Sequence, residues 1–209
     1  MTDRLPLSAF IIARNEADRI ARPIESVRGW VDEVVVIDSG STDGTIAVAE
    51  RLGAKVVHNE WAGYGPQKRF GEDQCRNDWL LNLDADEEVT PELAAEIRAK
   101  FADGSYREAD GWRIMIRDMY AHENAPAPWA YGYHQIRLYD RRQGRFSDSI
   151  VHDTVRPEEG AKNREPLRDH GAPLDPFAGF FRFPNTTATR PCRWRTCASG
   201  AANCPAAAF

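Results

Sequence analysis

Apolar and polar positions alternate along the first 120 residues in the order strand, helix, strand, helix. Residues 7–13 (LSAFIIA) form a short apolar run, typical of a strand that is buried on both faces. Between such runs, apolar residues recur at the spacing of one helical face, as at Ile20, Ile24 and Val27. We expect strands over residues 7–13, 34–37, 55–58 and 79–83, and helices over residues 19–30, 43–53, 66–75 and 90–101.

The last of these helices has the clearest start signal. Thr90 suits the N-cap, Pro91 suits the first helical position, and Glu92 places an acid in the first turn. The helix over residues 66–75 is only weakly patterned.

Strands separated by helices predict an α/β fold with a mainly parallel central sheet, flanked by helices on both faces. After Gly111 the pattern changes to strands without intervening helices, over residues 111–121 and 134–146, with a turn near residues 142–144. These strands predict an antiparallel addition at one edge of the sheet. Ligands of parallel sheets bind beyond the carboxyl ends of the strands. Three polar clusters follow predicted strands, at residues 14–16, 38–43 and 84–88.

Composition narrows the class of protein. The chain has 209 residues, is 42% hydrophobic and carries a net charge of −5, which suits a soluble globular protein and disfavours a nucleic-acid binder. It contains no run of 18 apolar residues, and its start, MTDRLPLSAF, lacks the pattern of a secretory signal. We therefore expect a cytoplasmic protein.

The charge is unevenly distributed. Only four bases and no acids follow Asp175, so the part up to that residue carries −9 and the remainder +4. The last part is rich in alanine, proline and arginine and holds three of the four cysteines, whose spacing does not fit a zinc site. We expect residues 172–209 to be an atypical, poorly structured tail, and hypothesise that a reading-frame shift produced it.

The strongest local signal is the acidic cluster after residue 83. Asp84 and Asp86 are one residue apart on a turn at a strand end, so both can face a cleft, and their oxygens suit Mg²⁺ or Mn²⁺. A solvated acidic loop is the alternative. Asp38 ends another predicted strand, and residues 38–43 supply acceptors for a ribose or uracil. The dinucleotide-binding glycine fingerprint and the Walker phosphate loop are absent.

Three segments of the chain resemble the family 2 inverting glycosyltransferases of the GT-A fold, in which the acidic cluster is a DXD motif. They are residues 13–16 (ARNE), 36–45 (VIDSGSTDGT) and 83–87 (LDADE). The chain looks closest to the lipopolysaccharide core biosynthesis glucosyltransferase branch, because of Gly63–Gly65 with residues 67–69, and because of residues 137–139 followed by residues 151–153. The resemblance implies a glycosyltransferase domain over residues 1–171.

The resemblance also implies a role for each motif. Asp38 with Ser39 and Gly40 would hold the nucleotide, helped by Arg14, Asn15 and Glu16. Asp86 would ligate the Mg²⁺ or Mn²⁺ that bridges the diphosphate, and Asp84 would contact the ribose or the water shell of the metal. Lys68 and Arg69 would be the basic partners of the diphosphate, although a solvated helix face is the alternative for this pair.

Inverting transfer needs a general base that takes the proton of the acceptor hydroxyl. In the resembled branch a His-Glu pair stands at this point, and here His152 and Asp153 replace it. We expect Asp153 to be the base and His152 to orient it or lie near the metal; His134 is a competitor.

The resemblance therefore predicts metal-dependent transfer of a hexose, with glucose favoured, from a UDP-sugar to a lipopolysaccharide core or other glycolipid acceptor. A polyprenyl-phosphate or other glycan transferase, and an inactive nucleotide-sugar-binding protein, remain alternatives. Such an acceptor implies peripheral contact with the inner membrane, for which a basic patch of Arg137, Arg141, Arg142 and Arg145 is the candidate. Aromatic residues that could form an acceptor pocket, or pack in the core, are Trp112, Tyr120, Trp129, Tyr131 and Tyr133.

Overall fold

The structure is a computed structural model, which describes residues 4–118, 131–151, 154–157 and 179–182. The elements in chain order are β1 (Leu5–Ala13), α1 (Ala21–Val27), β2 (Val31–Asp38), α2 (Thr45–Arg51), β3 (Lys55–His58), α3 (Tyr64–Gln74), β4 (Trp79–Asp84), β5 (Glu87–Val89), α4 (Pro91–Asp103), the 3-10 helix η1 (Ser105–Glu108), β6 (Gly111–Asp118), β7 (Gly132–Asp140), β8 (Gly144–Phe146), β9 (Val155–Pro157) and β10 (Gly179–Arg182).

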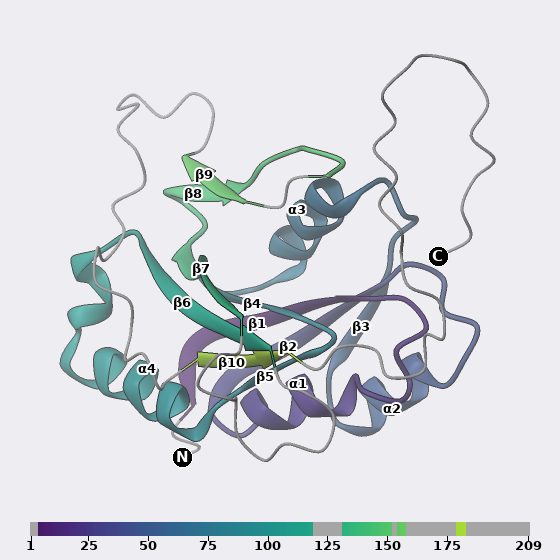
Figure 1. The fold of residues 1–209 in the computed structure, drawn as a ribbon, viewed down its shortest axis with the longest axis horizontal. Coiled ribbons are helices and arrows are strands. Elements are labelled where there is room, and N and C mark those ends of the chain that lie inside the picture. The colour runs from purple at the N-terminus through teal and green to yellow at the C-terminus, as the bar shows by residue number, and fades with distance from the viewer. Residues whose placement is uncertain (1–3, 119–130, 152–153, 158–178, 183–209) are drawn as a thin grey trace.

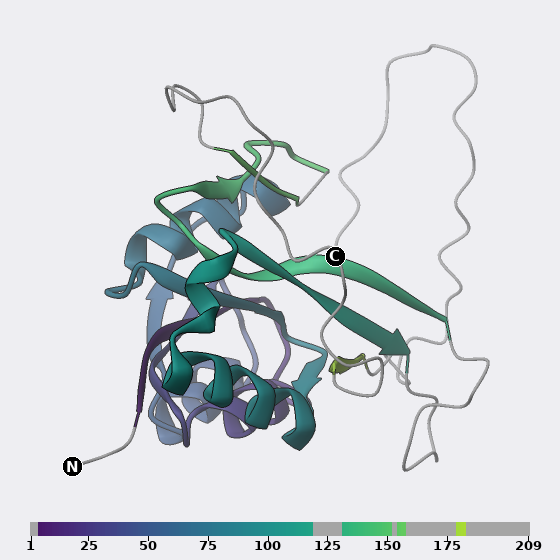
Figure 2. The same ribbon diagram turned by 90° about the vertical axis from the view of Figure 1, so that its left-hand side faces the viewer.

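The main sheet has the strand order β3-β2-β1-β4-β7-β6-β10-β5. The first four strands are parallel, and β7 then pairs antiparallel with both β4 and β6. The long strands β6 and β7 lie side by side (Figure 2). The predicted α/β fold, with its mainly parallel part and antiparallel addition, is confirmed.

Helices cover both faces of the sheet. Figure 1 shows α1, α2 and α4 below the sheet and α3 with the β8–β9 pair above it. Strand β1 explains the two layers, because alternate side chains point to opposite faces. Leu7 and Ile11 enter the larger buried cluster with α1 and α4, whereas Phe10 enters the smaller cluster with Phe146 of β8.

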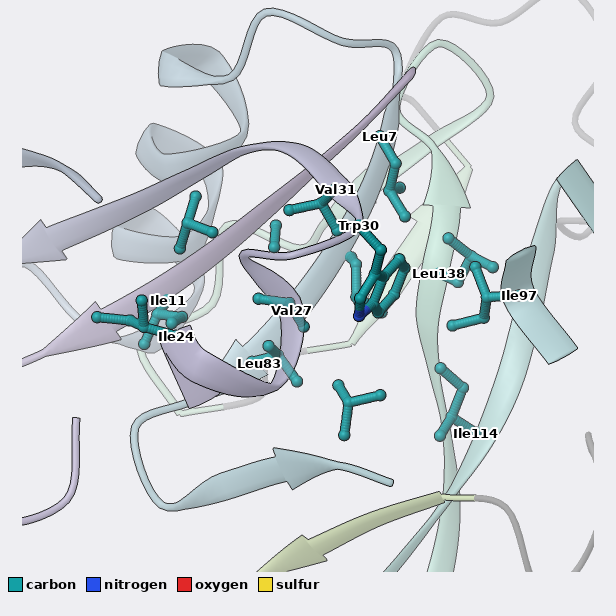
Figure 3. Close-up of a cluster of buried hydrophobic side chains, with 14 of the residues drawn as sticks. Leu7, Ile11, Ile24, Val27, Trp30, Val31, Leu83, Ile97, Ile114 and Leu138 are labelled. Carbon is teal, nitrogen blue, oxygen red and sulfur yellow. The ribbon is translucent and has the colours of Figure 1, made fainter. Parts of the chain in front are cut away.

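The larger cluster is the main core and is shown in Figure 3. In this close-up Ile24 and Val27 of α1 lie against strand residues, and Ile97 of α4 lies near Leu138 of β7. All four side chains are fully buried. Burying an aliphatic side chain of this size contributes roughly 1.5–3 kcal/mol, so these contacts fix the helices on the sheet.

The helices and strands expected from the apolar pattern are present, with shifted ends. Helix α1 is confined to Ala21–Val27, and α3 begins at Tyr64 rather than at residue 66. The expected strand over residues 134–146 is divided, because a turn at residues 141–143 separates β7 from β8, which pairs with β9 outside the main sheet.

Three short strands, β5, β9 and β10, have no counterpart in the apolar pattern. Strand β5 follows the acidic turn and pairs with β10, which also pairs with β6. Strand β10 lies within residues 172–209, where the sequence predicts a poorly structured tail. The rest of that range lies outside the described residues, so the domain boundary stays a prediction.

Candidate active site

The register of the parallel strands brings the predicted polar clusters together. Ala13 of β1 pairs with Asp38 of β2, and Ile12 of β1 pairs with Asp84 of β4. The two acids therefore flank the carboxyl end of the same strand, where ligands of parallel sheets bind. A cleft of about 410 Å³ opens there. It is lined by Ile12, Ala13, Arg14, Asn15, Glu16, Arg19, Ser39, Trp61, Tyr64, Asp84, Ala85 and Asp86.

Side-chain hydrogen bonds join the loop after β1 to the loop after β2. The N–H of Asn15 donates to Ser41 Oγ (2.9 Å), and the N–H of Thr42 donates to Asn15 Oδ1 (2.8 Å). The N–H of Glu16 donates to Thr45 Oγ1 (2.7 Å). Asn15 has a positive φ of 56°, a conformation that Asn adopts more readily than most residues. The two loops thus support each other before any ligand binds.

Asp38 is buried at the base of this loop pair. Its Oδ2 accepts hydrogen bonds from the N–H groups of Gly40 (2.8 Å) and Ser41 (2.9 Å), which closes the turn. Its Oδ1 has no hydrogen-bond partner among the described residues. A buried acceptor without a partner costs free energy. A donor group of a ligand could satisfy this oxygen, which suits the expected nucleotide contact.

Asp84 is held by two buried bases. Lys68 of α3 lies 3.0 Å from its Oδ1, and Arg137 of β7 donates to its Oδ2 at 2.9 Å. Burial alone would raise the pKa of Asp84, but Arg137 and Lys68 together hold that pKa well below its usual range. Asp84 is therefore ionised at neutral pH, and both of its oxygens already have a cationic partner.

Glu87 closes the turn that begins at Asp84. Its Oε1 accepts from Arg137 Nη2 (2.8 Å), and its Oε2 accepts from the N–H of Asp84 (2.9 Å). The Glu87 side chain is fully buried. Burial and the neighbouring Asp84 carboxylate raise the pKa of Glu87, whereas Arg137 lowers it. The acidic cluster is therefore not a solvated loop, because two of its carboxylates belong to a buried network.

Asp86 lies within the same turn, half-buried, and lines the cleft. Its charge reaches Glu16 of the β1 loop. Burial is the larger reason that the pKa of Glu16 is raised, Asp86 adds to it, and the ion pair with Arg19 opposes it. Asp86 thus places a carboxylate opposite the loop predicted to hold the nucleotide.

These acids can hold a divalent cation only together with other ligands. The described part of the chain contains no cluster of three or more His, Cys, Asp or Glu residues that could enclose a metal. Mg²⁺ is usually bound by one or two carboxylates plus waters and substrate phosphates. Asp86 and the partly exposed Asp84 fit this arrangement, in which a diphosphate completes the coordination.

The two bases predicted for the diphosphate lie on α3. Lys68 is fully buried against Asp84, so a solvated helix face is wrong for this residue. Arg69 Nη1 donates to the carbonyl of Phe146 at 3.0 Å. Among the described residues, the bases that line the cleft are Arg14 and Arg19. A diphosphate contact by Lys68 and Arg69 stays a prediction.

The predicted general base cannot be placed, since His152 and Asp153 lie outside the described residues. The competitor His134 is exposed on β7.

The aromatic residues at the cleft come from an unexpected segment. Trp61 and Tyr64 are 40% and 43% exposed, and their rings make an edge contact with centroids 4.9 Å apart. Both line the cleft. The nearby glycines are the sequence feature that could have pointed to this segment. A Cβ at Gly65 would lie 2.1 Å from the carbonyl oxygen of Ser147, so only glycine fits in the first turn of α3.

The aromatic residues expected in an acceptor pocket are divided. Trp112 is fully buried in the main core. Tyr131 and Tyr133 contact each other with ring centroids 5.9 Å apart, and Tyr120 and Trp129 lie outside the described residues. Core packing is therefore correct for Trp112.

The expected basic patch does not form as a surface. Arg137 is buried, and Arg141 donates to the carbonyls of Glu72 and Cys75. Arg142 pairs with Asp140, and Arg145 pairs with Glu72 and Asp73. No helix within the described ranges is long and apolar enough to cross a membrane. A peripheral membrane contact stays a prediction, without this patch to support it.

Comparison with known proteins gives consistent matches. A family described as "Glycosyl transferase family 2" matches residues 8–159. An uncharacterized glycosyltransferase of Rickettsia felis is 45% identical over 152 residues, covering 71% of this chain and 54% of that protein. The lipopolysaccharide core biosynthesis glycosyltransferase LpsC of Rhizobium meliloti is 35% identical over 184 residues, covering 78% of this chain and 62% of that protein. The chain spans about half the length of the first of these relatives.

A similar solved structure is that of S. aureus TarS 1-349 in complex with UDP-GlcNAc. It is 21% identical, covers 58% of this chain and 37% of that chain, and has a TM-score of 0.45.

Proposed function

Because this chain belongs to glycosyl transferase family 2, we propose that it catalyses metal-dependent, inverting transfer of a hexose, with glucose the favoured sugar, from a UDP-sugar to a lipopolysaccharide core or related glycan acceptor. The family and the observed sheet confirm the predicted GT-A fold. The similarity to LpsC supports an acceptor of the lipopolysaccharide core type.

One observation carries the proposal: the ends of β1, β2 and β4 bring the loop over residues 14–16, Ser39 and the Asp84–Asp86 turn around one cleft, with Asp38 buried directly beside Ser39. A nucleotide sugar needs an acceptor for its base or ribose, and also needs charge compensation for its diphosphate. The cleft is lined by both types of group: the polar side chains of Asn15 and Ser39, and the bases Arg14 and Arg19.

The donor would lie across these strand ends. In this proposal Asp38, Ser39 and Gly40 bind the uridine, supported by the loop of Arg14, Asn15 and Glu16. Asp86, with Asp84 beside it, would hold Mg²⁺ or Mn²⁺ against the diphosphate. When bound, such a cation stabilises the negative charge that develops on the leaving diphosphate. Arg14 and Arg19 line the same cleft and are further candidates for contacts with the phosphates.

The transfer itself needs one proton acceptor. As the acceptor oxygen forms a bond to C1 of the sugar, the bond between C1 and the phosphate oxygen breaks, and its electron pair leaves with UDP. Asp153 would take the proton of the acceptor hydroxyl, with His152 orienting it. The sugar configuration inverts because the nucleophile enters opposite the leaving group.

The direct test is a screen of nucleotide sugars for thermal stabilisation of the purified chain, with and without Mn²⁺. A ligand at 100 times its Kd stabilises the folded state by about 2.7 kcal/mol, so binding is measurable. We expect UDP-sugars to stabilise the protein only with Mn²⁺, and the best donor to be hydrolysed slowly.

The outcomes separate the alternatives. Binding without hydrolysis, or without transfer to any acceptor tested, would favour an inactive nucleotide-sugar-binding protein. Transfer to polyprenyl phosphate but not to lipopolysaccharide core sugars would change the acceptor class. A chain that binds no nucleotide sugar in either condition would sink the enzyme proposal.

A further inference from the structure

Arg137 is a fully charged side chain with 1% exposure, and it joins two other strands to β7. Its Nη1 donates to Asn82 Oδ1 on β4. Its Nη2 donates to Asp84 Oδ2 (2.9 Å) at the end of β4 and to Glu87 Oε1 (2.8 Å) on β5. Burying a guanidinium is costly unless it is paired and hydrogen-bonded. Both carboxylates that pair with the Arg137 guanidinium belong to the same turn, over residues 84–87.

That turn runs from Asp84 to Glu87 and contains Asp86. Glu87 Oε2 accepts from the N–H of Asp84, which ties the two ends of the turn together. Arg137 bonds to the side chains at both ends. Asp86 lies between them and lines the cleft. Asp86 therefore lies on a turn whose two ends are held by a clamp formed by Arg137 and Glu87.

The clamp needs the shape of arginine as well as its charge. A guanidinium presents several N–H donors in a fixed plane, whereas a lysine ammonium is a compact point charge on a flexible stem. Lys68 already supplies such a point charge to Asp84 Oδ1. Arg137 reaches Asn82 from Nη1 and reaches Asp84 and Glu87 from Nη2, whereas a lysine at this position would have to serve all three acceptors from a single nitrogen.

We propose that Arg137 is a positioning residue of the donor site, which holds the Asp84–Glu87 turn so that Asp86 can bind the divalent cation. The cation role rests on the proposed function, whereas the clamp on the turn does not need it. Residues that orient metal ligands typically change metal affinity by 10–100-fold when mutated.

The first experiment uses the metal-free protein and Arg137→Lys. The Asp84 N–H donates to Glu87 Oε2, so its hydrogen-exchange rate reports whether this hydrogen bond across the turn is formed. We expect exchange at this amide to be at least about tenfold faster in the variant than in the wild type. Arg142→Lys is the matched control, because Arg142 follows the same strand and pairs with Asp140, but its own side chain is exposed. It should exchange like the wild type.

The second experiment measures Mn²⁺ binding in the presence of UDP. We expect the apparent Mn²⁺ dissociation constant of Arg137→Lys to rise about 10–100-fold. A cooperative unfolding transition of the same variant would show that its fold survives. Arg142→Lys should bind Mn²⁺ like the wild type. A merely structural Arg137 would lower the unfolding temperature and leave the Mn²⁺ affinity unchanged.

Glu87→Gln provides an independent variant if Arg137→Lys does not fold. Both Glu87 oxygens accept hydrogen bonds, so the amide group of Gln would face one of two donors and open the clamp with almost no change in volume. The same loss of Mn²⁺ affinity is expected. Wild-type affinity in either folded variant would overturn the positioning role. A wild-type protein that binds no Mn²⁺ with UDP would overturn the cation role together with the proposed function, and the exchange data would then show whether the clamp exists.

Discussion

Replacing Tyr139 by Phe should lower the stability of the fold by removing one buried hydrogen bond. The hydroxyl of Tyr139 on β7 donates to Glu72 Oε1 of α3 at 2.7 Å, and both side chains are fully buried. Glu72 also accepts from the N–H of Phe146 (2.9 Å) and from Arg145 Nε (2.6 Å). Burial raises the pKa of Glu72, but the three donors and the charge of Arg145 oppose that rise and favour the carboxylate form. The bond from Tyr139 therefore ends on a charged group.

The expected loss follows from this geometry. A hydrogen bond to a charged group contributes about 1.5–3 kcal/mol. After its removal, Glu72 Oε1 keeps only the N–H of Phe146 as a donor. Phe fills nearly the same space as Tyr, so no cavity term adds to this figure. For a chain of this size, 1 kcal/mol corresponds to about 2–4 °C in Tm. We therefore expect Tm to fall by about 3–12 °C.

Urea unfolding measures the effect directly. The midpoint should fall while the m-value stays unchanged, because the same surface is exposed on unfolding. Tyr131→Phe is the matched control, since Tyr131 is 66% exposed, and its stability should stay within about 0.5 kcal/mol of the wild type. A loss below about 0.5 kcal/mol in Tyr139→Phe would refute the assignment of a charged, buried bond.

Three further substitutions test the site and one helix. Asp86→Ala removes the carboxylate proposed to bind the cation, so Mn²⁺-dependent stabilisation by UDP should disappear in a thermal shift assay. Asp153→Asn should leave UDP binding intact while transfer falls by about 100-fold or more, as expected for loss of a general base. Thr90→Ala removes the N-cap that accepts from the N–H of Leu93, which should lower stability by about 1 kcal/mol in urea unfolding.

Each of these expectations has a contrary outcome. Asp103→Ala, at the exposed end of α4, is the control for Asp86→Ala and should retain binding of UDP with Mn²⁺. Retained binding in Asp86→Ala would move the cation elsewhere. Unchanged transfer by Asp153→Asn would point to another base, with His134 the next to test. An unaltered unfolding midpoint in Thr90→Ala would show that the cap is energetically neutral.

The start of α4 shows why some local features could be predicted. Thr90, Pro91 and Glu92 are adjacent in the sequence, and their roles depend only on the geometry of the first helical turn. In the structure the Thr90 side chain accepts from the N–H of Leu93, and Pro91 begins the helix. Strands β1, β2 and β4 could also be predicted, because strands that are buried on both faces consist mostly of apolar residues.

Helix α3 shows where the hydrophobic pattern fails to predict burial. Its buried positions include Gln67, Lys68 and Glu72, which a hydrophobicity pattern assigns to solvent. Each has partners from distant segments: Gln67 donates to Ser39 Oγ, Lys68 contacts Asp84, and Glu72 accepts from Tyr139. Such groups can be buried only when these partners are in place, so the local sequence cannot predict their burial.

The sequence by itself determined the alternation of strands and helices, and with it the sheet edge at which Asp38, Asp84 and Asp86 meet. That information is local, since periodicity and caps act over a few residues. The tertiary structure alone decided that Asp84 is paired with two buried bases while Asp86 lines the cleft. Arg137 lies more than 50 residues from Asp84, and only the antiparallel pairing of β7 with β4 brings its guanidinium to that carboxylate. The physical reason is that a buried charge is stabilised by its neighbours in space, which no pattern along the chain records.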